Sequence, residues 1–291
     1  MICGGDMMDK SQCSDIELTA LREINWNSLP CYFLCGNHES SVADLKFSSV
    51  KALESKHHFI ISSPQVLTIN NINICFLPYI VESDRKPILE YFKNSEDRNI
   101  LISHNDIAGI NYGVVESKIG FSIQELSNNF KLILNGHLHN SSWVANNILN
   151  IGSLTANNFT NDSKKYSYGC WILDTETYKL TFFENPYAFN FYKIDILEET
   201  DLEKLANLKQ NAVISLKCLD SLVAKTKKII DKNKNIIETR LVTVKPIFSD
   251  GSTEYNLSDL TMDHLARFYE ICKEKIENTD VLDQELAEVL K

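Results

Sequence analysis

The 291-residue sequence predicts an α/β fold. Short apolar runs alternate with helical segments through the first half of the chain, as strands and helices alternate in α/β domains. Several of these runs end directly in polar clusters that contain histidine, which is where α/β scaffolds place their ligands. No apolar run approaches the roughly 20 residues that cross a bilayer, and no signal peptide is visible, so we expect no membrane association.

Local signals place the elements of the first half. The stretch Ser14-Asp15-Ile16-Glu17 is the pattern of a capping box and predicts a short helix that ends near Ile24. Residues 66–69 and 72–77 flank Asn70-Asn71, which is the pattern of a β-hairpin. We further expect buried strands over residues 31–35, 99–103 and 131–134, and a helix over residues 42–56.

The second half divides at Asn185-Pro186. Before this point we expect consecutive antiparallel strands over residues 147–151, 169–174 and 179–184. After it we expect strands over residues 189–196 and 236–245, and helices over residues 199–208 and 219–232. The predicted organisation is a first domain over residues 1–186, a small α+β capping domain over 187–250, and a helical tail over 251–291. An apolar stripe in the tail predicts either a partner-binding helix or packing on the capping domain.

Composition excludes some functions. The net charge of −10, from 29 basic and 39 acidic residues, argues against a nucleic-acid module with a wholly basic surface. It does not exclude an enzyme that meets phosphate through metal ions, because bound dications reverse the local sign of the charge. Eight cysteines without a C-x-x-C pair indicate small buried thiols in a reducing compartment. We therefore expect a cytoplasmic protein, in the host cytoplasm if a phage encodes it.

Four polar clusters carry the candidate chemistry, and each follows an apolar strand. Carboxylate, amide and imidazole groups without thiolate suit Mn²⁺, Fe²⁺ or Zn²⁺. Two such ions about 3.5–4 Å apart hydrolyse phosphate esters in many enzymes. Taken singly, each cluster is also compatible with a solvated strand end or a histidine that caps the core. The clusters are Gly5-Asp6, Gly36-Asn37-His38-Glu39, Ser103-His104-Asn105-Asp106 and Gly136-His137-Leu138-His139.

The order and intervals of these clusters resemble the calcineurin-like metallophosphoesterase superfamily. Within it, the chain is most similar to SbcD-type double-strand-break-repair nucleases, especially bacteriophage recombination-endonuclease subunits. The resemblance covers about residues 1–200, with supporting stretches at residues 102–110, 135–140, 150–155 and 171–177. It implies a sandwich of two sheets flanked by helices and metal-dependent hydrolysis of DNA phosphodiesters. It also implies an SMC-like ATPase partner and a homodimer.

The resemblance further implies a role for each site residue. Two divalent ions are expected, most simply Mn²⁺, with Asp6 bridging them. Asn37, His104 and His137 would complete one metal site, and His139 would belong to the other. His38 would face the scissile phosphate and protonate the leaving oxygen. Glu39 and Asp9 are expected to support the ligands or to cap a helix and not to bind metal themselves, and the pair His57-His58 is expected to form a surface turn without a functional role.

The sequence departs from the family pattern at its beginning. The family opens with a strand ending in Asp-x-His, which supplies ligands of the first metal, whereas here Met1 lies five residues before Asp6 and no Asp-x-His occurs. Two interpretations stay open: a nuclease that lacks its first segment, or a binding subunit that has lost one metal site. The retained ligands favour the first. Among enzymes, a phosphoesterase for nucleotides or phosphoproteins is the alternative, and the capping segment favours the nuclease.

Overall fold

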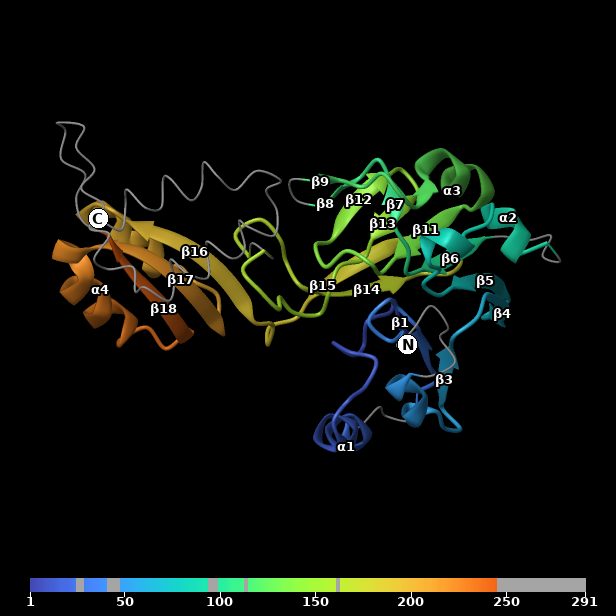
Figure 1. Ribbon diagram of the computed structural model, residues 1–291, viewed down its shortest axis with the longest axis horizontal. Coiled ribbons are helices and arrows are strands. Elements are labelled where there is room, and N and C mark those ends of the chain that lie inside the picture. Colours follow the sequence, from blue (N-terminus) through green and yellow to red (C-terminus); the bar gives the residue numbers. More distant parts are fainter. Residues whose placement is uncertain (25–28, 41–47, 94–98, 113–114, 161–162, 245–291) are drawn as a thin grey trace, which may run out of the picture. The chain divides into compact units, whose positions relative to one another are not determined.

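The computed structural model describes residues 1–24, 29–40, 48–93, 99–112, 115–160 and 163–244 (Figure 1). These residues belong to one compact unit, Met1–Val244. The unit is mixed α/β, with several sheets and few helices. This agrees with the α/β fold class that the sequence predicts. The predicted tail over residues 251–291 lies outside the described residues. Within the described part of the chain, no helix combines the length and apolarity that crossing a membrane requires.

The largest sheet has six strands in the order β12-β13-β11-β6-β5-β4. The four central strands run parallel, and an antiparallel strand closes each edge. Their bounds are β4 Gln65–Ile69, β5 Ile72–Leu77, β6 Ile100–Ser103, β11 Leu132–Asn135, β12 Ser142–Ala145 and β13 Ile148–Asn150. The predicted hairpin joins β4 to β5, where Asn70 and Asn71 have φ values of 50° and 60°, the left-handed geometry of a two-residue turn.

Both faces of this sheet are covered. On one face, Leu101 and Ile133 pack with residues of α2 (Ile88–Tyr91) and α3 (Ile123–Asn129). On the other face, Ile102 packs with residues of a second, three-stranded sheet. Neighbouring residues such as Leu101 and Ile102 point to opposite faces because side chains alternate along a strand. Apart from Asn73 and the polar residues at their carboxyl ends, the central strands are therefore apolar, as expected for strands buried on both faces.

The three-stranded sheet is parallel and has the order β1-β2-β3. Its strands are β1 Ile2–Cys3, β2 Cys31–Leu34 and β3 His58–Ile61, and the predicted helix α1 (Asp15–Glu23) begins with the expected capping box at Ser14. The predicted helix over residues 42–56 is not found in its described part. There, only a 3₁₀ helix forms over Ser49–Leu53, because Ser48 and Ser49 bond to backbone amides of Val50 and Cys13.

Smaller ladders complete this part of the chain. The strands β14 (Gly169–Leu173) and β15 (Leu180–Glu184) pair antiparallel, as predicted. The strand expected over residues 147–151 is found as β13, but it pairs with β11 and β12 and not with β14, so its predicted place in that antiparallel series is wrong. Four two-residue strands form two more ladders: β7 (Ile107–Ala108) with β10 (Phe121–Ser122), and β8 (Asn111–Tyr112) with β9 (Val115–Glu116).

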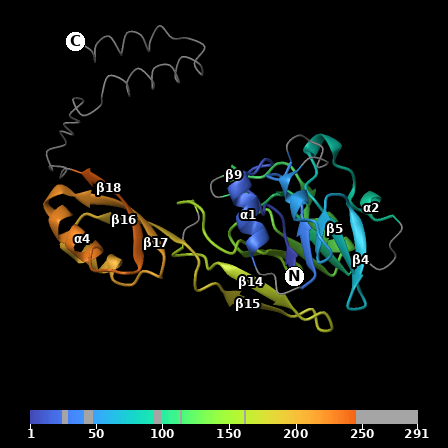
Figure 2. The ribbon, with the colours of Figure 1, turned by 90° about the horizontal axis from the view of Figure 1, so that it is seen from below.

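The segment after Pro186 forms a separate three-stranded parallel sheet with its own apolar core. Its strands are β16 Asn190–Ile196, β17 Ala212–Leu219 and β18 Ile236–Val244, and the first and third were predicted. The helix α4 (Val223–Ile230) packs beside this sheet, as Figures 1 and 2 both show. The helix predicted over residues 199–208 is a 3₁₀ helix, Glu199–Leu205.

The described cysteines are free thiols. Cys31, Cys35, Cys75 and Cys218 are buried, as predicted, whereas Cys170 is exposed. Burial raises the pKa of the Cys35 thiol to about 12, so this thiol stays protonated and serves as a small apolar group.

Candidate metal centre

The polar clusters lie at the carboxyl ends of parallel strands. His104 directly follows β6, and Gly136-His137 follows β11, the neighbour of β6. In the register of the sheet, Ser103 is opposite Asn135, so both strands end at the same level. The loops after β1 and β2 carry Asp6 and Asn37. Four loops far apart in the sequence therefore meet at one site.

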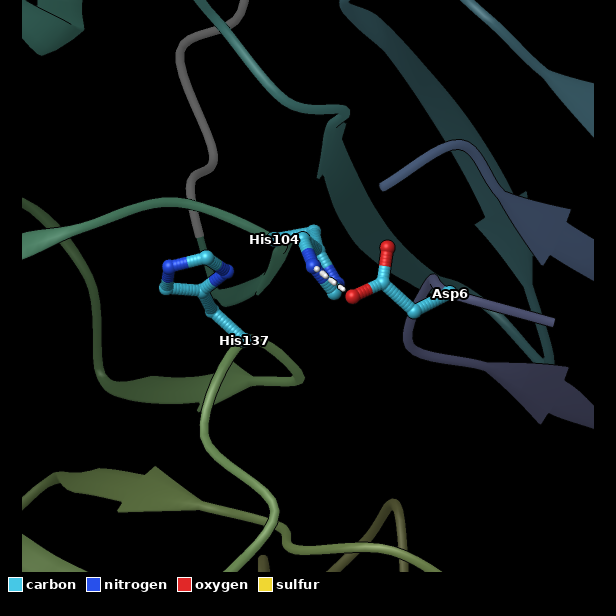
Figure 3. A group of neighbouring side chains, drawn as sticks. All are labelled: Asp6, His104 and His137. Atoms are coloured by element: carbon cyan, nitrogen blue, oxygen red, sulfur yellow. Dashed lines mark ion pairs between the residues drawn. The ribbon is translucent and has the colours of Figure 1, made fainter. Parts of the chain in front are cut away.

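Three candidate ligands converge there (Figure 3). One ligand atom each from Asp6, His104 and His137 lies within 4.8 Å of the others. The closest pair joins His104 Nε2 to Asp6 Oδ2, 3.1 Å apart. His104 is fully buried, and the side chains of Asp6 and His137 are 14% and 16% exposed, which leaves the group accessible from one side. The three residues form a possible metal-binding group.

The environment of His104 shows why a cation suits this group. Its Nδ1 lies 2.8 Å from the carbonyl oxygen of Gly4, which can only accept, so Nδ1 carries the proton. Its Nε2 then faces two oxygens, Asp6 Oδ2 and Asn37 Oδ1, both at 3.1 Å. If Nε2 carried no proton, its lone pair would point at the lone pairs of both oxygens, and this contact would be repulsive. Either a second proton on the ring or a cation shared by the three atoms resolves this contact.

Asp6 is held in an unusual backbone conformation. Its φ of 52° lies in the left-handed region, which a residue other than glycine adopts at a cost in free energy. The amide of Asp6 donates to Glu39 Oε2 at 2.9 Å, and Asp6 Oδ1 accepts from the amide of His38 at 3.0 Å. Burial alone would raise the pKa of the Asp6 carboxyl, but His104 and the His38 amide outweigh it and lower the pKa. The side chain is therefore an anionic ligand.

Glu39 organises the loops around Asp6. It is completely buried, and its carboxylate accepts from the amides of Asp6, Met8 and Gly36 at 2.7–2.9 Å. Burial raises the pKa of this carboxyl, and the amide donors partly oppose that effect. Glu39 thus holds the backbone after β1 against the backbone after β2 and does not belong to the three-ligand group.

The glycines permit the close approach of these loops. A Cβ on Gly36 would overlap Asp6 Oδ1 and would lie 2.8 Å from His104 Nε2. A Cβ on Gly136 would overlap the carbonyl oxygen of Gly4. Both positions therefore require a residue without a side chain.

His137 has neighbours that the sequence did not indicate as partners. Its Nε2 lies 3.3 Å from Asp106 Oδ1, and its ring meets the His104 ring edge-on with centroids 5.0 Å apart. The Tyr79 ring stacks on its other side, with centroids 6.4 Å apart. Asp106 could have been considered from its position two residues after His104. Tyr79 follows β5, and only the pairing of β5 with β6 brings it to the site.

His38 and His139 lie at the margin of the group. His38 Nδ1 lies 2.8 Å from the carbonyl oxygen of Asp9, and its Nε2 is 3.9 Å from Asp6 Oδ2. The bond to Asp9 and the nearby carboxylates raise the pKa of the half-exposed His38 ring. His139 Nδ1 contacts Asn157 Nδ2 at 3.3 Å, and burial lowers its pKa. Of the predicted residues, the structure therefore brings together Asp6, Asn37, His104 and His137, places His38 beside them, and leaves His139 outside the three-ligand group.

A buried asparagine network connects the loops that carry the ligands. Asn135 Oδ1 accepts from the amide of Asn105, and Asn135 Nδ2 donates to Asn105 O and Asn150 Oδ1, at 3.0–3.1 Å. Asn105 follows His104 directly, and Asn135 comes two residues before His137. All three asparagines are 1% exposed. Because buried amides without partners are costly, this network fixes the relative positions of the loops after β6 and β11.

The comparisons with known proteins add no assignment. No known protein-family model matches this chain, and no curated protein is significantly similar to it.

Proposed function

We propose that this chain is a metal-dependent phosphodiesterase that acts on DNA ends, of the calcineurin-like metallophosphoesterase type and nearest to the SbcD-type nucleases. The observation that supports it best is the convergence of Asp6, His104 and His137 within 4.8 Å, from three separate loops. Structural ion pairs also place histidines beside carboxylates. Here, Nε2 of a fully buried histidine faces both a carboxylate and an amide oxygen, and a shared cation would satisfy all three atoms.

Asp6, Asn37, His104 and His137 are the residues that would hold a divalent ion. A bound ion such as Mn²⁺ supplies Lewis-acid stabilisation of the charge that develops on phosphoryl oxygens. The chain itself fixes the tautomer of His104 through the Gly4 carbonyl and keeps Asp6 ionised. These features support the ligand assignment independently of the resemblance.

His38 is the proposed general acid. Its Nδ1 donates to the Asp9 carbonyl, which orients the ring and leaves Nε2 on the side of Asp6. A proton on Nε2 can pass to the leaving oxygen of the phosphodiester as water adds to phosphorus. The half-exposed ring can regain this proton from solvent.

DNA, an SMC-like ATPase and a second copy of the chain are the proposed partners. They follow from the resemblance of the first 200 residues. The net charge of −10 means that contact with DNA must rely on local features such as the metal centre.

The test combines Mn²⁺ binding by calorimetry with hydrolysis of linear duplex DNA, a nucleoside monophosphate and a phosphopeptide. We expect Mn²⁺-dependent cleavage of linear DNA that a chelator stops. His104→Ala should lose both metal and activity. His38→Ala should keep the metal while turnover falls about 10²–10⁴-fold, the usual contribution of a general acid.

His57→Ala is the matched control, because His57 lies outside the site, next to β3. It should leave both metal binding and cleavage unchanged. Hydrolysis of the phosphopeptide or the nucleotide alone would favour the phosphoesterase alternative. Metal binding without hydrolysis would favour a binding subunit, and cleavage that survives His104→Ala would contradict the ligand assignment.

A further inference from the structure

A cavity of about 600 Å³ lies beside the candidate metal centre. It is formed by the segment after β3 and the segment after β5, and its volume is within the range of about 300–1,000 Å³ that is usual for small-ligand sites. Its walls include Ser63, Pro64, Tyr79, Ser83, Lys86 and Tyr91. None of these residues belongs to the proposed ligands or general acid.

Tyr79 joins the cavity to the metal centre. Its ring lies nearly parallel to the His137 ring, with an interplanar angle of 27° and centroids 6.4 Å apart. Its amide donates to the carbonyl of Cys35 at 2.9 Å, and the next amide, of Ile80, donates to Asn105 Oδ1 at 2.9 Å. Cys35 directly precedes the Gly36-Asn37 loop, and Asn105 directly follows His104. The wall and the ligands are therefore held as one assembly.

The other walls offer a mixture of groups. Ser62, Ser63 and Ser83 also line the cavity. So does Tyr91, whose hydroxyl accepts from the amide of Lys86 at 2.9 Å. An aromatic wall, hydroxyl groups and polar edges suit a flat heteroaromatic ring that carries hydrogen-bonding groups at its rim.

One cation of the cavity lining, Lys86, is exposed. The charged residues of the lining are the basic Arg85 and Lys86 and the acidic Asp84. The Arg85 guanidinium pairs with Glu82 and lies 5.0 Å over the Phe121 ring, so it is a structural group. The exposed Lys86 is the cation that can meet a phosphate of a bound chain.

We infer that this cavity binds the nucleoside attached to the phosphate that the metal centre receives, with its base stacked on Tyr79. The inference rests on the proposed function, since it names the substrate group next to the reacting phosphate. Stacking on an aromatic ring tolerates any base, because every base has a π-face. The site would therefore hold DNA without reading its sequence.

Binding of small probes tests this inference without any turnover. Deoxyribose 5-phosphate carries a hydroxyl where deoxyadenosine 5′-monophosphate carries the base. Calorimetry in the presence of Mn²⁺ compares the dissociation constants of the two probes. We expect the nucleotide to bind about tenfold more tightly, the size of effect that base stacking on an aromatic side chain usually has. Tyr79→Ala and Tyr79→Leu should abolish this difference in affinity, whereas Tyr79→Trp, which keeps an aromatic ring, should retain it. Tyr187→Ala is the control, because Tyr187 is 79% exposed and lines no part of the cavity.

The outcomes separate the two proposals. Equal affinity for the two probes, or a difference that survives Tyr79→Ala, would overturn the inference while Mn²⁺-dependent cleavage of DNA leaves the proposed function standing. Tighter binding of O-phosphotyrosine than of the nucleotide would also overturn it and would indicate a peptide ligand. If no Mn²⁺ binds and no DNA is cleaved, the proposed function fails. A base-dependent difference that Tyr79→Ala removes would still support the nucleoside cavity in that case.

Discussion

The six-stranded sheet and the sheet β16-β17-β18 differ in the residues that end their parallel strands. In the six-stranded sheet, the last residues of β6, β11 and β13 are Ser103, Asn135 and Asn150, all buried and polar. In the sheet β16-β17-β18, the corresponding ends are apolar, and Ile196 closes β16 with 0% exposure. Both sheets have parallel strands and an apolar core. The difference lies only in what is buried at the carboxyl ends.

That difference distinguishes the sheet that carries the candidate metal centre from the one that does not. A buried polar group is costly unless it is hydrogen-bonded, so a cluster of them needs a network. In the six-stranded sheet the network joins three loops and leads to His104 and His137. The sheet β16-β17-β18 also buries an asparagine, Asn190. In the described part of the chain, its side-chain amide donates to the carbonyls of Ala188 and Gln210, which lie next to this sheet and not at the metal centre. A parallel sheet alone therefore does not make a site.

The largest expected effect comes from Gly36→Ala. A Cβ at this position would overlap the carboxylate of Asp6 and approach His104 Nε2, so two ligands must move. We expect Mn²⁺ affinity to fall by more than about 100-fold, beyond the loss usual for a supporting hydrogen bond. Calorimetric titration measures it directly. Gly109→Ala is the control, because its Cβ would meet nothing within 4 Å and only its φ of 85° is unfavourable. An equal loss of affinity in both variants would contradict this account.

Asn135→Ala and Asn190→Ala test the two sheets directly. Each removes a buried amide that holds loops together, and each should lower the free energy of unfolding by about 1–3 kcal/mol. Only Asn135→Ala should also weaken Mn²⁺ binding, by about tenfold or more, because Asn135 positions the loops that carry the histidines. Chemical denaturation and metal titration give the two values. Weakened metal binding in Asn190→Ala would remove the distinction between the sheets.

The smallest effect on stability is expected from Asp201→Asn, in the 3₁₀ helix Glu199–Leu205 that connects β16 to β17. Lys204 and the amides of Leu197 and Glu198 lower the pKa of Asp201 to about 2. Because the folded pKa lies below the unfolded value, ionised Asp201 stabilises the fold above about pH 4, and this stabilisation is lost as the pH falls toward 2. The wild type should melt slightly higher than Asp201→Asn at pH 7, and the gap should narrow as the pH is lowered. A gap independent of pH would argue against this role of the charge.

Sequence patterns predicted the strands best where local signals agreed. The hairpin at Asn70-Asn71, the buried strands β2, β6 and β11, and the capping box at Ser14 each rest on a pattern within a few residues. The strand β17 was not predicted, although it is the central strand of its sheet. From Ile214 to Cys218 its buried apolar residues alternate with the less buried Ser215 and Lys217, so the period of a strand was present in the sequence but was not used.

The candidate site could be predicted as residue types but not as geometry. The clusters around Asp6, Asn37, His104 and His137 were visible as strand-terminal polar groups, and the structure brings these four together. The contacts of Asp106 and Tyr79 with His137 depend on how the loops fold and on the pairing of β5 with β6. Such contacts leave no local pattern in a single sequence.

The hydrogen bond from His104 to the carbonyl of Gly4 has a consequence for folding. It joins residues 100 positions apart, and the same imidazole faces Asp6 and Asn37 from two other loops. Closing so long a loop costs entropy that only neighbouring contacts can offset, so we expect the site to form after the six-stranded sheet. A substitution at Gly4 or His104 should therefore speed unfolding more than it slows folding. The residues proposed for chemistry would then also set how long the folded chain persists.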